Sequence, residues 1–332
     1  MIYEYALDPN LVVNWAINGT GRVVGQFGMD QRRLLSDFPK DWKGQAYGEF
    51  YKHFEYDDTS LEFQNAQLEF DAYVQLLTDH TVRRNRTIGE NSSWFDEALR
   101  EHNSHPFHAI MASHTGDGSC AAVITPNVID DIRDDRWYLP TIASARKTAA
   151  EIARAVAPLL KVANKIVLVD PYFDPSEPRF LATFEEMMKI AFGASRCIET
   201  LPSVTIMTNV YQAHRRQDGE FTASQKANVA ADLTHKANQH LPGHLPKGAL
   251  VDFYCLEHPP SGDAFHNRFV LTDVGGVIAP YGLDDCSSGA THNAKDDLQP
   301  MSKGAYEGRW KQYVEKRDIS IIGNLVRVVG VV

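Results

Sequence analysis

The stretch KIVLVDPYFDP, residues 165–175, decides the fold of the second half of the chain. After Lys165 it is a continuous apolar run that ends at Asp170 and Pro171. Continuous apolar runs, as opposed to alternating ones, are typical of strands buried on both faces of a sheet. The Asp-Pro pair ends the strand and begins an exit loop that carries polar groups. We therefore expect a central strand here, with helices packed on the sheet.

The segments around this strand alternate between helical and extended patterns. Strand, helix, strand, helix, strand is the signature of a βαβ sheet, so the second part is expected to be α/β. In such sheets ligands gather at the carboxyl ends of the strands. The expected strands are residues 165–170, 203–210, 249–257 and 319–323, and the expected helices are 136–164 (with an apolar stripe from Ile142 to Leu160), 178–192, 222–241 and 305–316.

The first part of the chain is mixed and poorly periodic. Residues 59–85 have apolar positions at roughly helical spacing, and residues 106–113 and 120–125 have the composition of short strands. No residue pattern in this part points to chemistry. We predict a mixed α+β domain of unknown role over residues 1–135 and an α/β domain over residues 136–332.

Composition limits the classes of function. The 332 residues carry a net charge of -10 and a pI near 5.7, which argues against a surface that coats nucleic acid non-specifically. No window approaches the length of a membrane span, and the first residues lack a signal pattern, so a cytoplasmic protein is expected. The cysteines, Cys120, Cys197, Cys255 and Cys286, are too far apart to predict a disulfide framework or a zinc site.

Polar residues stand at the ends of the predicted strands. Asp170 and Asp174 follow the first strand, and Asn209 ends the next, so all three are candidates for binding a substrate. The plain alternative is that the two aspartates only cap a turn and the start of a helix.

A second apolar stretch, FHNRFVLTDVGGVIAPYGLDD at residues 265–285, carries a histidine and an arginine two residues apart. Residues of equal parity on a strand face the same way, so His266 and Arg268 are expected to point to one side together. An imidazole can attack phosphorus while a guanidinium holds two phosphate oxygens. Asp273 has the opposite parity and is expected to orient a partner or cap the turn. The alternative is that His266 and Arg268 are solvent-facing polar residues of an edge strand.

Residues 266–273, HNRFVLTD, resemble the H-x-K-x4-D motif of the phospholipase D superfamily, with arginine in place of lysine. The Gly-Ser-x-Asn segment that usually follows is replaced by Gly282, Leu283 and Asp284. The arginine, the glycines after the motif strand and this ending resemble a divergent branch, which includes bacterial proteins and the C-terminal domain of MIT-domain proteins. The resemblance extends from about residue 140 to the C-terminus.

The resemblance implies a site and a mechanism. His266 would form a phosphohistidine, Arg268 would clamp the phosphate and Asp273 would support them as a carboxylate. Gly282 and Asp284 would lie on the phosphate side, where an unpaired Asp284 would repel the substrate. No metal and no cofactor are implied. Because the chain has one copy of the motif, the resemblance implies a homodimer that assembles one site from two histidines.

Two classes of function follow from these expectations. The first is a phosphodiesterase, more a nuclease than a lipase because no amphipathic membrane-binding stretch is present, with a role in genome defence as one expectation. The second is a catalytically silent module on the same fold that binds phosphate, nucleic acid or a protein partner. In either case the N-terminal part is a candidate for docking protein partners.

Overall fold

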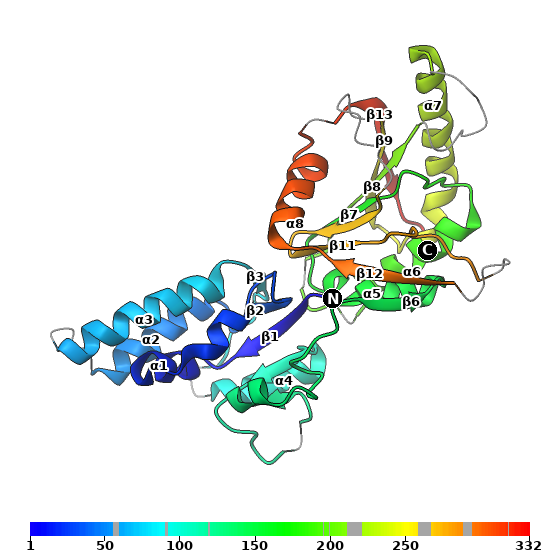
Figure 1. The fold of residues 1–332 in the computed structure, drawn as a ribbon. Coiled ribbons are helices and arrows are strands. Elements are labelled where there is room, and N and C mark those ends of the chain that lie inside the picture. The colour runs from blue at the N-terminus through cyan, green and yellow to red at the C-terminus, as the bar shows by residue number, and fades with distance from the viewer. Residues whose placement is uncertain are drawn as a thin grey trace. The chain divides into compact units, whose positions relative to one another are not determined.

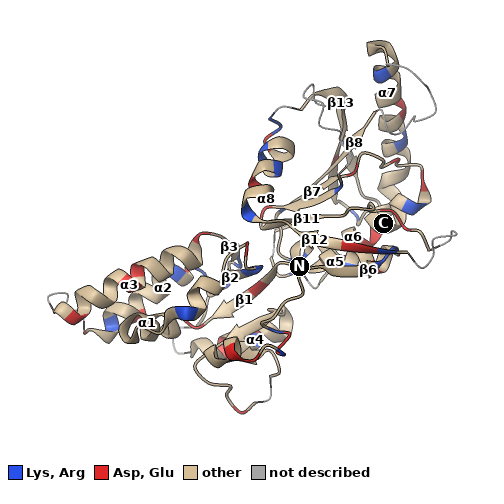
Figure 2. Ribbon diagram, in the orientation of Figure 1, with Lys and Arg blue, Asp and Glu red and all other residues tan. Residues whose placement is uncertain are grey.

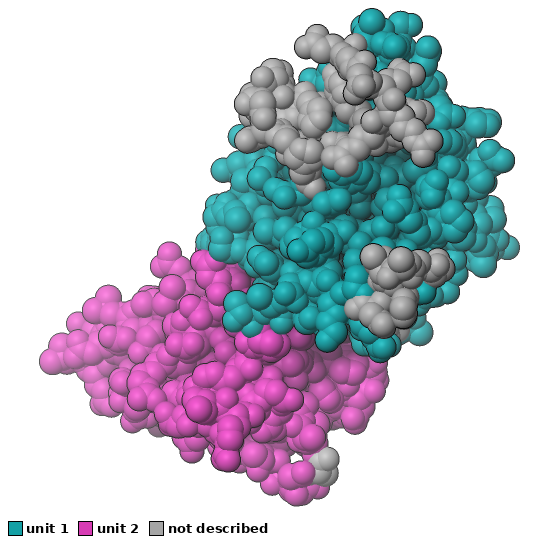
Figure 3. Space-filling model, turned by 45° about the vertical axis from the view of Figure 1, so that its right-hand side comes forward, with its two compact units in different colours: residues 1, 141–196, 200–332 teal, residues 2–140, 197–199 magenta. Residues whose placement is uncertain are grey.

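The computed structural model describes residues 1–55, 60–89, 92–118, 120–194, 196–198, 200–210, 221–257, 267–287, 294–317 and 319–332. The chain divides into two units, one formed by residues 2–140 with 197–199 and the other by residue 1 with 141–196 and 200–332 (Figure 3). The main division therefore falls after Pro140. Each unit has its own sheet, and the chain has the expected mixture of helices and strands (Figure 1).

The N-terminal unit is built on a parallel sheet. Its five described strands are ordered β3-β2-β1-β4-β5, and each neighbouring pair is parallel. The strands expected at 106–113 and 120–125 are present as β4 and β5, whereas β1, β2 and the parallel pairing had no clear sequence signal. The strands are β1 (Tyr3–Leu7), β2 (Arg33–Asp37), β3 (Thr81–Arg83), β4 (Ala109–Met111) and β5 (Val123–Ile124).

Helices bury both faces of this sheet. Along β1, Tyr5 and Leu7 belong to the larger apolar core, while Ala6 belongs to a second core on the other side. Successive residues of a strand point to opposite faces, so this division shows that both faces are covered. The helices are α1 (Pro9–Asn18), α2 (Trp42–His53), α3 (Leu61–Thr78) and α4 (Trp94–Ser104), with short 3-10 turns at Gly21–Gln26 and Pro126–Asp130.

The C-terminal unit contains the predicted βαβ sheet. Strands β7 (Lys165–Val169), β8 (Ser203–Asn209) and β9 (Leu250–Leu256) are parallel and are connected by α6 (Pro178–Ala191) and α7 (Ala223–His240). Among the described residues the sheet has eight strands in the order β13-β9-β8-β7-β10-β11-β12-β6. The remaining strands are β6 (Ala143–Arg146), β10 (Phe269–Thr272), β11 (Gly275–Ile278), β12 (Lys295–Pro300) and β13 (Ile321–Val329).

The helix predicted over residues 136–164 was too long. Helix α5 spans Ala149–Leu160, and it begins after Thr148, whose side chain accepts a hydrogen bond from the amide of Glu151. The residues before it form β6, which pairs with β12, so Ile142 lies outside the helix. This pairing joins segments far apart in the sequence, which a local pattern does not predict.

The last predicted helix and strand also have different bounds. Helix α8 covers Lys303–Arg309 and continues as a π-helical turn, η4, at Trp310–Val314. The strand expected at 319–323 is β13, which extends to Val329 because it pairs with β9 along most of its length.

The two faces of the eight-stranded sheet have different helices. On one face, Leu168 and Ile206 of the sheet line a cavity together with Phe173 and with Phe184 of α6. On the opposite face lie α8 and η4, where Tyr313 contacts Phe269 (Figure 1). In the part of the chain that the structure describes, no helix is long and apolar enough to span a membrane.

Candidate functional site

The candidate site lies where β7 ends and β10 begins. The two strands are antiparallel, with Phe269 opposite Val169, so the residue before β10 meets the residue after β7. These residues are Arg268 and Asp170, and the arginine Nε lies 3.9 Å from the aspartate Oδ1. Topology thus brings two of the predicted residues together at the predicted end of the sheet. His266 lies outside the described residues.

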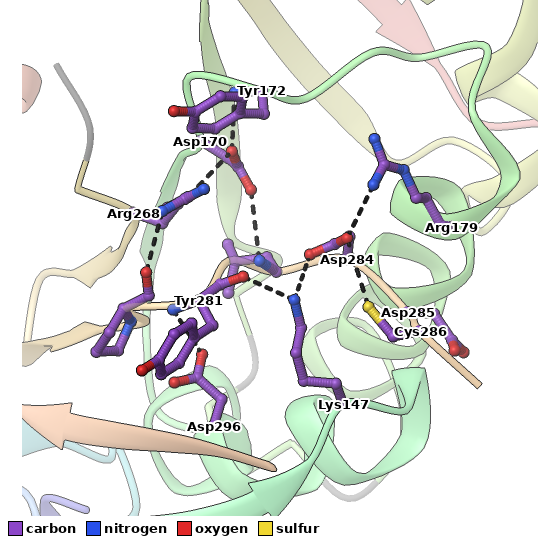
Figure 4. A network of polar contacts seen from close by, with 12 residues as sticks. Lys147, Asp170, Tyr172, Arg179, Arg268, Tyr281, Asp284, Asp285, Cys286 and Asp296 are labelled. Atoms are coloured by element: carbon purple, nitrogen blue, oxygen red, sulfur yellow. Dashed lines mark hydrogen bonds and ion pairs between the residues drawn. The ribbon is translucent and has the colours of Figure 1, made fainter. Parts of the chain in front are cut away.

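The guanidinium of Arg268 is held on two sides. Its Cζ lies 4.4 Å from the centroid of the Tyr172 ring, and its Nη1 donates a hydrogen bond of 3.0 Å to the carbonyl of Pro280 (Figure 4). Its Nε is buried and makes no hydrogen bond with any described residue. Stacking and one carbonyl therefore fix the plane of the guanidinium, and the Arg268 side chain as a whole is 21% exposed.

Asp170 is a buried counter-charge for this arginine. Its side chain is 2% exposed, and its carboxylate accepts hydrogen bonds from the backbone amides of Tyr172, at 2.9 Å, and Leu283, at 3.4 Å. Burial raises its pKa to about 6, while the amide of Tyr172 and the charge of Arg268 act in the opposite direction. Asp170 is thus predominantly ionised at neutral pH and ties the 282–284 loop to the end of β7.

Gly282 lets this loop pass close to the arginine. Its φ is 99°, a conformation that L side chains rarely adopt. A Cβ at this position would lie 3.0 Å from Asp284 Oδ1 and 3.6 Å from Arg268 Nε. Glycine is therefore required both by the backbone conformation and by the space beside Asp284.

Asp284 is neutralised by two cations that the sequence analysis missed. Lys147 Nζ lies 2.6 Å from Asp284 Oδ1, and Arg179 Nη1 lies 3.1 Å from Oδ2 (Figure 4). Burial alone would raise the pKa of Asp284, but Lys147 and Arg179 outweigh it and hold the pKa below its usual range. A paired Asp284 repels a phosphate much less than a lone carboxylate would.

Lys147 and Arg179 come from separate elements, so spacing could not have identified them. Lys147 directly precedes the Thr148 cap of α5, and Arg179 lies in the first turn of α6. Lys147 Nζ also donates a 2.6 Å hydrogen bond to the carbonyl of Tyr281, which joins the start of α5 to the loop. The available signal was Asp284 itself, since a carboxylate in an apolar stretch needs a partner.

The other predicted residues lie outside this cluster. Asp273 is at the far end of β10, where its carboxylate accepts hydrogen bonds from the amides of Asn164 and Lys165 at 2.9 and 3.1 Å. It therefore secures the start of β7 and does not contact Arg268. Asp174 accepts a hydrogen bond of 2.8 Å from the amide of Ser176, as the capping alternative expected, and pairs with Lys236 at 3.1 Å.

Asn209 is fully buried at the end of β8, where its backbone N–H donates a hydrogen bond of 3.4 Å to the carbonyl of Pro171. It helps to place the loop that carries Tyr172. The cluster is consequently formed by Arg268, Asp170, Gly282 and Asp284, together with Tyr172, Lys147 and Arg179.

The charged side chains of the cluster are three cations, Lys147, Arg179 and Arg268, and two carboxylates, Asp170 and Asp284. Among the described residues, no three His, Cys, Asp or Glu side chains are grouped so as to hold a metal ion. No protein-family model matches this chain, and none of the curated proteins compared with it matches. The functional conclusion therefore depends on the site itself and on the resemblance of residues 266–273.

Proposed function

We propose that this protein is a phospholipase D-like phosphodiesterase, and specifically a metal-independent nuclease that acts through His266. The observation that supports the proposal most directly is the orientation of the Arg268 guanidinium. Its guanidinium is oriented by Tyr172 and Pro280 at the sheet end, two residues after His266, and its side chain is 21% exposed, so that a phosphate can reach it.

The proposed reaction has two steps. The His266 imidazole attacks phosphorus, the bond from phosphorus to the leaving oxygen breaks, and a phosphohistidine forms while Arg268 holds the non-bridging oxygens. Water then attacks the phosphohistidine and releases the phosphomonoester and free His266. In the proposed homodimer, acting in the cytoplasm, the second subunit's histidine protonates the leaving oxygen and then accepts the proton from the attacking water.

A second candidate function is supported by Asp284. It stands where the resemblance leads one to expect neutral serine and asparagine groups, and it occupies both Lys147 and Arg179. A site in which these cations are already neutralised favours reversible binding over catalysis. The second candidate is therefore a silent phosphodiester-binding module with the same residues.

The test is a screen of single-stranded DNA, duplex DNA, RNA and bis(p-nitrophenyl) phosphate with chelator present. We expect cleavage by the wild type, loss of at least about a thousandfold for His266→Ala, and a large loss for Arg268→Ala. His235→Ala, an exposed histidine on α7, is the matched control and should retain full activity. Cleavage that survives in His266→Ala would refute the mechanism. Absence of cleavage across all substrates, with retained binding, would select the silent module.

A further inference from the structure

We propose that the segment Lys303–Arg317, formed by α8, η4 and the residues that follow, is a binding surface for single-stranded nucleic acid. The protein as a whole has a net charge of -10. This segment instead contains the cations Lys303, Arg309, Lys311, Lys316 and Arg317 against the carboxylates Glu307 and Glu315. Lys and Arg are spread along this part of the chain in Figure 2.

In the part of the chain that the structure describes, three of these cations have no carboxylate partner, although Arg309 Nη1 donates a hydrogen bond to Gln312 Oε1 and Lys316 Nζ donates one to the Tyr254 hydroxyl. Arg317 pairs with Glu315 at 2.8 Å, but Arg309, Lys311 and Lys316 form no ion pair with a carboxylate among the described residues. Cations elsewhere in the same unit are commonly neutralised, as Arg146 is by Glu151 and Lys189 is by Glu185. The positive charge of the segment is therefore not cancelled locally, although the protein is acidic.

Aromatic rings lie beside these cations. Lys316 Nζ is 3.9 Å from the centroid of the Tyr254 ring, and Trp310 lies on the same helical segment with Lys165 Nζ 5.9 Å from its ring centroid. Both rings are partly exposed. Cations interleaved with accessible rings match a single strand, whose phosphates and unpaired bases are both available, better than a duplex, whose bases are stacked away.

The segment approaches the sheet end that carries the candidate site. Tyr254, Met207, Val169 and Phe269 form one row across neighbouring strands. Lys316 stands over Tyr254 at one end of this row, and Arg309 Cζ lies 5.2 Å from the Phe269 ring at the other. Phe269 directly follows Arg268 in the chain. A single-stranded nucleic acid bound along the segment would therefore run beside the end of the sheet.

The backbone of the segment has two uncommon features. The turn Trp310–Val314 is π-helical, and Lys316 has a positive φ of 57° although it is not glycine. π-helical turns and left-handed non-glycine residues occur preferentially at functional positions. Lys311 lies within this turn, and Lys316 follows it by two residues.

The test measures binding and not cleavage, so it is independent of the proposed nuclease function. The affinity of the full chain for a labelled 20-nucleotide single-stranded DNA is measured by fluorescence anisotropy, in chelator, over a range of salt concentrations. The variant Arg309→Gln/Lys311→Gln/Lys316→Gln should bind about 100-fold more weakly at 0.1 M salt, and its salt slope should fall by about 2. The matched control is Arg146→Gln/Arg154→Gln/Lys189→Gln, which removes the same charge from β6, α5 and α6 and should bind within about twofold of wild type.

Thermal melts of both variants establish that they are folded. Equal loss of binding in the two variants would mean that net charge alone decides the affinity, and the surface would be rejected. Absence of binding by the wild type, or tighter binding of a duplex of the same length, would also overturn the proposal. A wild type that binds through this segment but cleaves nothing would refute only the nuclease.

Discussion

The ammonium of Lys147 lies 2.6 Å from the carboxylate of Asp284, and this contact decides the character of the candidate site. The lysine side chain is 8% exposed and the aspartate side chain 12%, so the pair is largely shielded from water. Asp284 is the residue in which this chain departs most from the expected phosphate-binding segment. Because Asp284 is paired with Lys147, its negative charge is compensated, and the presence of an aspartate here does not by itself exclude an anion.

Lys147→Met should destabilise the protein by about 3 kcal/mol, because it leaves the buried carboxylate of Asp284 with Arg179 as its remaining ion partner. The measurement is the free energy of unfolding from urea titration at pH 7. Arg179→Gln is the control, since its side chain is 52% exposed and the pair it breaks is worth about 0–1 kcal/mol. Equal losses in the two variants would contradict the ranking of these ion pairs.

Asp170 should make the stability of the protein fall as the pH rises from 4 to 7. Its folded-state pKa of about 6 lies above its ordinary value of 3.8, so its contribution is complete below about pH 4 and is lost as the pH passes 6. The difference corresponds to about 3 kcal/mol. The measurement is the unfolding free energy of wild type minus that of Asp170→Asn at pH 4.5 and pH 7. A difference that does not change with pH would show that burial does not control this carboxyl.

Tyr172→Ala should weaken the binding of inorganic phosphate about two- to fivefold, because the ring no longer holds the guanidinium of Arg268 in place. Tyr172→Phe keeps the ring and should bind phosphate as the wild type does. Isothermal titration calorimetry measures both variants. If the alanine variant binds phosphate normally, the stacking of Arg268 on Tyr172 is not part of the site.

Gly282→Ala should destabilise the protein by about 1–2 kcal/mol and weaken phosphate binding, since the new Cβ meets Asp284 and the positive φ is unfavourable for alanine. Gly308→Ala is the matched control. Its Cβ would meet nothing within 4 Å, and it lies in α8, so the change should be neutral or stabilising by up to about 1 kcal/mol. Chemical denaturation of the two variants gives the comparison, and a destabilisation by Gly308→Ala as large as that by Gly282→Ala would contradict it.

Local patterns identified the elements that bury apolar residues at a regular period. The run Ile166–Val169 and the helices expected at 178–192 and 222–241 predicted a βαβ sheet, and the structure confirms it with the parallel strands β7, β8 and β9. Patterns were poor guides where a strand is short or lies at a sheet edge. β6 was assigned to a helix for this reason, because its partner β12 lies about 150 residues further along the chain and supplies the pairing that its own sequence does not predict.

For the candidate site, the sequence alone determined which end of the sheet to examine and which residue types stand there, since Asp-Pro after an apolar run marks a strand end and parity relates neighbouring side chains. Only the tertiary structure decided which of them meet. It placed Arg268 against Asp170 and Tyr172, moved Asp273 to the opposite end of β10, and gave Asp284 its partners Lys147 and Arg179. The physical reason is that a buried charge is stabilised by whichever opposite charge the packing of helices on the sheet brings within contact, and that packing is not encoded in local spacing.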